Sequence, residues 1–157
     1  MRADEFIAGR KKAGLIPFYT DSDGQVLMLF MVPSNPAYGG TQPQIAKGGV
    51  DEGESVQIAA IREAQEELGM AKKNLRNIRQ VLTTVIEDNY IMSLFIAEVK
   101  NPNKVGKTDF ETGKRYWLTI HEFEKYGRDD QVRLVQHAHQ FMRSAQRSAP
   151  VERGQVS

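Results

Sequence analysis

The chain has 157 residues, of which 40% are hydrophobic and 26% charged, and its 21 basic and 20 acidic side chains leave a formal net charge of +1. This length and composition are typical of a single globular domain and exclude collagen-like, low-complexity and wholly disordered proteins, while the lack of cysteine excludes disulfides, zinc–thiolate sites and cysteine nucleophiles. The near-neutral charge argues neither for a nucleic-acid coat nor for a membrane-surface protein. Because the sequence has no apolar run of spanning length and no apolar core of a signal peptide, we expect a cytoplasmic protein with no membrane partner.

Turn residues divide the first part of the chain into a hairpin and a loop. Residues 15–19 are predicted to form a strand, at a sheet edge or a bulge because Pro17 has no N–H. Residues 26–32 are predicted as a buried strand that completes a hairpin, with the Asp- and Gly-containing segment 21–24 as its turn. Residues 33–42 are rich in proline and glycine and predict a loop, and 44–46 form a short extended piece.

The rest of the chain is predicted to contain two helices with three strands between them. The first helix spans 55–68 and ends at Gly69, and the strands span 77–87, 90–99 and 114–120. Asp129 or Asp130 is expected to cap the second helix. We assign residues 1–143 to one domain and residues 144–157 to a disordered tail, because the tail has no apolar stripe. This order of elements predicts a mixed α/β (α+β) domain.

Three glutamates on the first helix conflict with helix stability. Glu63, Glu66 and Glu67 are spaced at i, i+3 and i+4, so they share one helix face. Like charges at this spacing repel, and two of the three lie in the last turn, where the helix dipole favours cations. Bound Mg²⁺ or Mn²⁺ would turn this repulsion into attraction. The alternative that spacing alone leaves open is an ordinary solvated acidic surface.

Residues 48–70 resemble the signature box of the Nudix hydrolases. The residues that match it without a gap are Gly48, Glu54 and the run Arg62-Glu63-Ala64-Gln65-Glu66-Glu67-Leu68-Gly69-Met70. The one departure is Ala64, where a larger aliphatic residue is usual although alanine also occurs. The elements on either side of the box are consistent with the α/β/α sandwich of that family, a mixed β-sheet between helices.

The resemblance implies hydrolysis of a pyrophosphate bond in a nucleoside diphosphate linked to another group. It also implies one or more Mg²⁺ or Mn²⁺ ions as cofactor. The metal ligands that it implies are the Gly48 carbonyl, Glu63, Glu66 and Glu67.

The resemblance implies further catalytic roles for three kinds of residue. Arg62 would orient the glutamates, with Glu54 as its ion-pair partner. The general base would be Glu63 or Glu67, since family members differ in which one serves. A further glutamate often precedes a downstream strand that carries a tryptophan, and Glu111 fits that description. Asp109 is the weaker choice for that position, and an ordinary loop carboxylate is the alternative.

Several residues are candidates for binding the substrate. Lys47, directly before the box, could meet a phosphate, and Gly49 lets the backbone approach a phosphate closely. Tyr90, and with it Tyr38 and Phe30, could stack on a base. The alternatives are a solvent-exposed lysine and aromatic side chains that serve core or loop packing.

Residues outside the box favour a (di)nucleoside polyphosphate as the substrate. The lead-in at 43–49 is similar to that of dinucleoside polyphosphate and RNA 5′-pyrophosphohydrolases, though it lacks their flanking tryptophan. ADP-ribose pyrophosphatases usually carry a proline about sixteen residues past the box, where this chain has Ile86. The alternative activity is hydrolysis of ADP-ribose or of a nucleoside triphosphate. An RNA 5′ end is a weaker alternative as substrate, because long basic runs are absent. An alternative of another class is a non-catalytic, nucleotide-binding regulatory domain. We expect a monomer or a homodimer.

Overall fold

The computed structural model describes residues 10–86 and 89–147. In these ranges six strands form one mixed sheet of order β4-β5-β1-β2-β6, with β3 paired to β1. The elements in chain order are β1 (Lys11–Thr20), β2 (Val26–Pro33), η1 (Pro36–Tyr38), β3 (Ala46–Gly49), α2 (Val56–Leu68), η2 (Lys72–Asn74), β4 (Leu75–Ile86), β5 (Tyr90–Val99), β6 (Thr112–Leu118), α3 (Ile120–Tyr126), η3 (Asp129–Gln131) and α4 (Val132–Arg147). The predicted α/β class is confirmed.

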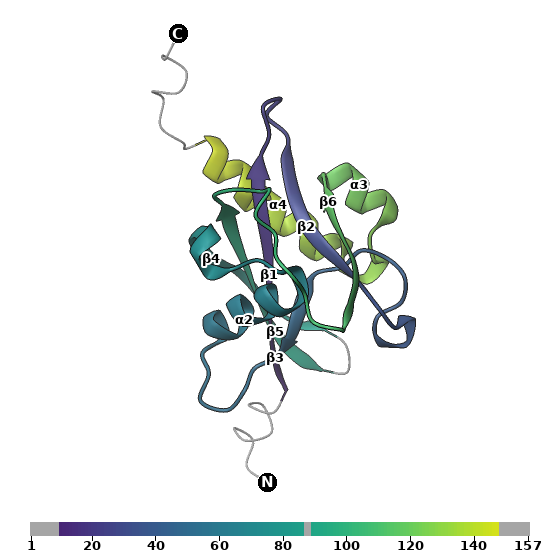
Figure 1. Ribbon diagram of the computed structural model, residues 1–157. Helices are drawn as coiled ribbons and strands as arrows, with labels where there is room; N and C mark the ends of the chain where they lie inside the picture. Colours follow the sequence, from purple (N-terminus) through teal and green to yellow (C-terminus); the bar gives the residue numbers. More distant parts are fainter. Residues whose placement is uncertain (1–9, 87–88, 148–157) are drawn as a thin grey trace.

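Helices cover both faces of the sheet. Figure 1 shows α2 in front of the strands and α4 behind them. Two clusters of buried side chains correspond to these two layers: Ala13, Leu15 and Phe95 belong to the cluster under α2, and Ile16 and Phe30 to the one under α3 and α4. Successive strand residues enter opposite clusters because side chains alternate across a sheet. The result is an α/β/α sandwich.

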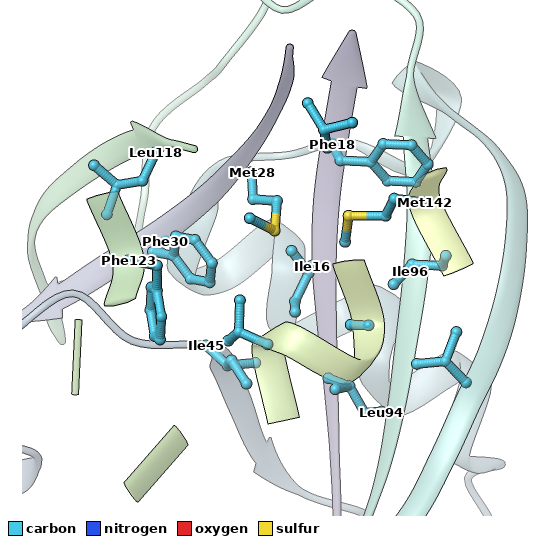
Figure 2. Close-up of a cluster of buried hydrophobic side chains, with 14 of the residues drawn as sticks. Ile16, Phe18, Met28, Phe30, Ile45, Leu94, Ile96, Leu118, Phe123 and Met142 are labelled. Carbon is cyan, nitrogen blue, oxygen red and sulfur yellow. The ribbon is translucent and has the colours of Figure 1, made fainter. Parts of the chain in front are cut away.

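The core under α3 and α4 is filled by large apolar side chains. Figure 2 shows the rings of Phe30 and Phe123 side by side, with centroids 4.3 Å apart. Met142 of α4 lies in the same cluster as the strand residues Ile16 and Met28. Phe30 is fully buried here, so its candidacy as a base-stacking residue is wrong.

β1 is the central strand, so of the two positions predicted for Pro17, a sheet edge or a bulge, the edge is wrong. Its residues 11–18 pair in parallel with β5, and on its other side residues 12–15 pair with β3 and residues 18–20 with β2. Pro17 falls between the two paired segments on that second side. Because proline has no N–H to donate, this gap lets it occupy a central strand with little loss of ladder hydrogen bonds.

The end of the chain differs from the prediction in three ways. β6 ends at Leu118, and the unpredicted helix α3 follows, begun by a capping box of Thr119 and Glu122. Asp129 and Asp130 form the turn η3 before α4 and make no side-chain cap. α4 continues to Arg147, so residues 144–147 are helical and only 148–157 of the predicted tail lie outside the described residues. In the described part of the chain, no helix combines the length and apolarity needed to span a membrane.

Candidate active site

Helix α2 is defined by caps at both ends and by small residues on its inner face. The Ser55 side chain accepts a hydrogen bond from the Ile58 N–H at 3.1 Å, and Gly69 ends the helix in the left-handed region at φ 68°. The residues that pack on the sheet are Ala59, Ala60, Ala64 and Leu68. Because three of these are alanines, the helix backbone can approach the sheet closely, and the glutamates between them are drawn inward.

Two of the three glutamates predicted as metal ligands are buried against β3. Glu63 and Glu67 are each only 8% exposed, whereas the Glu66 side chain is 43% exposed. Glu67 Oε1 accepts a hydrogen bond from the Lys47 backbone N–H at 2.9 Å. A Cβ at Gly48 would overlap the Glu63 carboxylate, so only glycine allows this approach. The structure therefore brings the box glycine and the helix carboxylates together.

Arg62 lies among the acidic residues and fixes their positions. It makes two hydrogen bonds to the Glu54 carboxylate, at 2.9 and 3.0 Å, and one to Glu63 Oε1 at 2.9 Å. It also lies 3.4 Å from Glu66 Oε2 and donates to the Gly49 carbonyl at 2.9 Å. The paired guanidinium holds the pKa of Glu54 at about 2. The predicted Arg62–Glu54 ion pair is present, and it ties the loop before α2 to the helix.

Burial makes ionisation of the two inner glutamates costly. Desolvation raises the pKa of Glu63 to about 7, although the Arg62 charge opposes the rise. Desolvation raises the pKa of Glu67 to about 8, with the Glu63 charge adding to it. The charge of Glu111 contributes to the rise at both residues. A cation at this position would relieve both the repulsion and the desolvation cost.

The loop between β5 and β6 docks on the C-terminal end of α2. The Asp109 N–H donates to the Glu66 carbonyl at 2.7 Å, and the Thr112 hydroxyl donates to the Glu67 carbonyl at 2.8 Å. These bonds satisfy carbonyls that a helix end leaves free. They also hold the exposed Glu111 where its charge acts on the two buried glutamates. Its catalytic role stays a prediction.

A cavity of about 490 Å³ opens beside Glu67. Its lining includes Glu67, Glu111 and Lys47, together with the highly exposed rings of Tyr38 (82%) and Phe110 (86%). The volume is in the range of small-molecule sites. The cavity therefore combines carboxylates, a cationic side chain and two aromatic rings that nothing else in the fold buries.

A family model described as the NUDIX domain matches residues 10–138. The chain belongs to the Nudix hydrolase family. The match covers all six strands and extends into α4, and Nudix hydrolases cut pyrophosphate bonds. A search of curated proteins found no match.

Solved structures share this Nudix fold. A C. elegans Ap4A hydrolase in a binary complex has a TM-score of 0.68 and 24% identity over 85% of this chain and 98% of that one. The NUDIX domain of Shewanella oneidensis NrtR, complexed with ADP ribose, has a TM-score of 0.70 and 15% identity over 90% and 99%. The M. smegmatis Nudix hydrolase RenU has a TM-score of 0.65 and 16% identity over 90% and 88%. At these identities the likeness shows the fold.

Nudix hydrolases generally need a divalent metal ion, and the donor set of this chain fits one. Glu63, Glu66 and Glu67 offer only oxygen atoms, which Mg²⁺ and Mn²⁺ prefer. Among the residues that the structure describes, no three acidic or histidine side chains are arranged as a ready-made metal site. The reason is that each of the three carboxylates points to a protein partner, either Arg62 or the Lys47 N–H. Ion binding would therefore compete with these hydrogen bonds.

Two of the predicted substrate-binding residues have other contacts. Tyr90 begins β5, and its ring lies 4.2 Å from the Lys12 Nζ, away from the residues that line the cavity. The Gly49 carbonyl accepts the hydrogen bond from Arg62. Lys47, in contrast, does line the cavity beside Glu67.

Of the twelve residues that line the cavity, sequence reasoning named only Tyr38, Lys47, Glu67 and Glu111. Phe110 and Arg128 are the aromatic and the charged residue among those it missed. Arg128 follows α3 and contacts Gln44 Oε1 at 3.1 Å and Asp130 Oδ1 at 2.8 Å. No motif includes either residue, because each lies in a loop that only the fold brings to the site. A lone aromatic residue in the polar segment 107–112 was the available signal for Phe110.

Proposed function

We propose that this Nudix hydrolase cuts a pyrophosphate bond of a (di)nucleoside polyphosphate and uses Mg²⁺ or Mn²⁺. The observation that carries the proposal is the buried pair Glu63 and Glu67. Arg62 orients Glu63, the Lys47 N–H orients Glu67, and Glu67 lines a cavity. An acidic surface helix would leave such residues in water. Burying them costs free energy that a structural role does not require.

The chain supplies the ligands and the base of the proposed reaction. Glu63, Glu66, Glu67 and the Gly48 carbonyl would hold the ion, and Arg62 keeps the carboxylates in place. The bound ion would neutralise the diphosphate oxygens and make water more acidic. Glu63 or Glu67 takes a proton from the attacking water, whose oxygen bonds to phosphorus as the bridging P–O bond breaks. Glu111 is the further candidate for this proton transfer.

The cavity suggests how the substrate is held. The rings of Tyr38 and Phe110 are exposed at the cavity and offer faces for a nucleobase, since aromatic stacking favours π-surfaces that are otherwise in water. The Lys47 side chain lines the same cavity and can meet a phosphate. The lead-in at 43–49 adds the resemblance to hydrolases of dinucleoside polyphosphates. Together these features favour a base and a polyphosphate in one site.

A panel of substrates tests the proposal. Diadenosine polyphosphates, ADP-ribose, nucleoside triphosphates, NADH and a 5′-triphosphorylated RNA are incubated with the enzyme and Mg²⁺ or Mn²⁺, and released nucleotides are separated by chromatography. We expect a nucleoside polyphosphate to have the highest kcat/KM. A higher value for ADP-ribose would move the assignment to that substrate. No turnover of any compound at micromolar enzyme would favour a non-catalytic nucleotide-binding domain instead.

A site variant links the activity to the cavity. Tyr38→Ala and Phe110→Ala remove exposed rings that support no core, so the fold should persist. We expect each to raise KM for the best substrate about tenfold, in line with about 1–1.5 kcal/mol for one stacking contact. Tyr126→Ala removes another exposed ring, at 54% exposure and away from this cavity, and should leave KM unchanged.

A further inference from the structure

A second surface groove, of about 640 Å³, is lined by four lysines from separate parts of the chain. Lys73 comes from the turn after α2, Lys100 from the end of β5, and Lys104 and Lys107 from the loop that follows. All four are exposed. No acidic residue belongs to the lining among the described residues. The whole chain has a net charge of only +1, so the four positive charges of this groove are balanced by an excess of acidic residues elsewhere in the chain.

The groove has a fixed floor. The buried Asn74 side chain donates to the carbonyls of Asn101, at 3.0 Å, and Lys104, at 3.1 Å, and accepts from the Asn101 N–H at 2.9 Å. The Lys100 N–H donates to the Asn74 carbonyl at 2.8 Å. On the far side, the Gly106 N–H donates to the Gly69 carbonyl at 2.8 Å. The backbone that carries the lysines is therefore anchored to the turn after α2.

The four lysines keep their charges available. Within the described residues none of them makes an ion pair with a carboxylate, whereas Arg62 and Arg128 do. Four ammonium groups around one groove repel each other, and an anion would remove that repulsion. The other lining residues are one glutamine, three asparagines, two glycines, Ala71 and Val105, so Val105 is the only large aliphatic residue among them. A protein partner would call for an apolar anchor that this surface does not offer.

The groove lies next to the catalytic helix and shares a loop with the active site. Gln65 and Gly69 at the end of α2 line it, and the segment that carries Lys104 and Lys107 continues directly to Glu111. That segment docks on the last turn of α2 through Asp109. A phosphate chain held in the groove would therefore lie beside the element that carries the proposed metal ligands.

We propose that this lysine groove binds the phosphodiester backbone of a nucleic acid strand. Lysine is a point charge suited to phosphate, and the alternating anionic groups of a strand can engage several lysines at once. Backbone binding of this kind needs no sequence-specific contact. The groove is separate from the cavity at Glu67, so strand binding does not depend on the hydrolysis proposed there.

The test is fluorescence anisotropy with a 3′-labelled 12-nucleotide RNA that has a 5′-hydroxyl, in EDTA so that no hydrolysis occurs. The groove variant is Lys104→Ala/Lys107→Ala. The matched control is Lys125→Ala/Arg133→Ala, which removes the same charge from exposed residues of α3 and α4. Binding is measured from ~25 to ~200 mM salt, a range over which counterion release changes the affinity strongly. Thermal unfolding of both variants verifies that they are folded.

We expect the groove variant to bind RNA at least about tenfold more weakly at low salt, and the control to stay within about twofold. The slope of log K against log salt should become shallower by about 0.7 for each lysine removed, or about 1.4 for the pair. Equal weakening by the two variants, or no binding by the wild-type chain, would overturn the proposal. The affinity for a DNA of the same sequence is measured as well. Equal affinity for DNA and RNA would mean that the contacts are to phosphate, and weaker DNA binding would mean that the 2′-hydroxyl also contributes. Tighter binding of a polyglutamate peptide than of either strand would assign the groove to an acidic protein and also overturn it.

Discussion

The two faces of the sheet are built on different principles. The face under α4 buries Val135, Ala138 and Met142 against other apolar side chains, with Phe123 of α3 beside them. The face under α2 buries Ala60 and Ala64, but it places two carboxylates among them. The first face stabilises the fold by removing apolar area from water. The second carries charge repulsion and desolvation that lower stability, which is common at catalytic sites.

This contrast predicts that substitutions on the two faces have opposite profiles. Changes to Phe123, Val135, Ala138 or Met142 should reduce stability and leave chemistry intact, because none of these four residues lines the cavity beside Glu67. Substitution of Glu63 or Glu67 in α2 should abolish hydrolysis and leave the fold intact or more stable.

Glu67→Gln should have the largest effect. It keeps the size of the side chain and the hydrogen-bond acceptor for the Lys47 N–H but removes a proposed ligand and base. We expect kcat to fall by about 10³-fold or more, which corresponds to about 4 kcal/mol. Steady-state rates measure this, and circular dichroism verifies the fold. Glu52→Gln, at an exposed position of the loop before α2, is the matched control. Wild-type turnover in Glu67→Gln would contradict the assignment.

Phe123→Ala tests the opposite face. The ring is fully buried against Phe30, and removing a buried phenylalanine costs about 3–5 kcal/mol of unfolding free energy. We expect urea denaturation to show a loss of that size, while kcat at a temperature well below the transition stays within about twofold. Phe123→Leu should show a smaller stability loss of the same kind. A large fall in kcat of the folded Leu variant would mean that the two faces are not independent.

Glu111→Gln should have an intermediate effect. Its side chain is exposed, and its charge acts on both buried glutamates without a direct hydrogen bond between them. We expect kcat to fall about tenfold, or about 1.4 kcal/mol, with little change in KM. The measurement is a Michaelis–Menten series beside Glu52→Gln. An unchanged kcat would remove Glu111 from the site.

The smallest predicted effect concerns stability and pH in EDTA. Because burial raises the pKa of Glu67 to about 8 from an ordinary value of 4.5, the folded chain binds this proton more tightly than the unfolded one. Its stabilising contribution is complete below about pH 4.5 and is lost as the pH rises to 8. Between about pH 6 and 9 the melting temperature of the wild type should therefore fall a few degrees further than that of Glu67→Gln. Parallel melting curves for the two proteins would contradict the predicted burial cost.

The sequence could predict the part of the site that is local in the chain. Residues 48–70 form one turn and one helix, so their spacing alone places Arg62 and Glu66 near each other. The end of the helix at Gly69 could be predicted for the same reason, whereas Ser55, predicted as the first helical residue, is the N-cap. The sequence could not predict the burial of Glu63, because this burial depends on how closely the alanine face of α2 approaches β3.

Features assembled from distant segments could not be predicted. The cavity takes Tyr38, Phe110 and Arg128 from three separate segments. Only Tyr38 was among the predicted candidates, and none of the three belongs to a motif. The lysine groove could not be predicted, because Lys73, Lys100, Lys104 and Lys107 are separated in the sequence and only the fold brings them together. Helix α3 was not predicted because Thr119 and Ile120, which are β-branched and follow β6 directly, were assigned to the strand 114–120.

The most direct test of the central claim is calorimetric titration of the enzyme with Mn²⁺, in the presence and absence of a non-hydrolysable nucleotide. We expect saturable binding that is at least about tenfold weaker in Glu63→Gln/Glu67→Gln and unchanged in Glu52→Gln, because carboxylate oxygens are the ligands that this ion prefers. No uptake by the wild type, or equal uptake by the double variant, would contradict it.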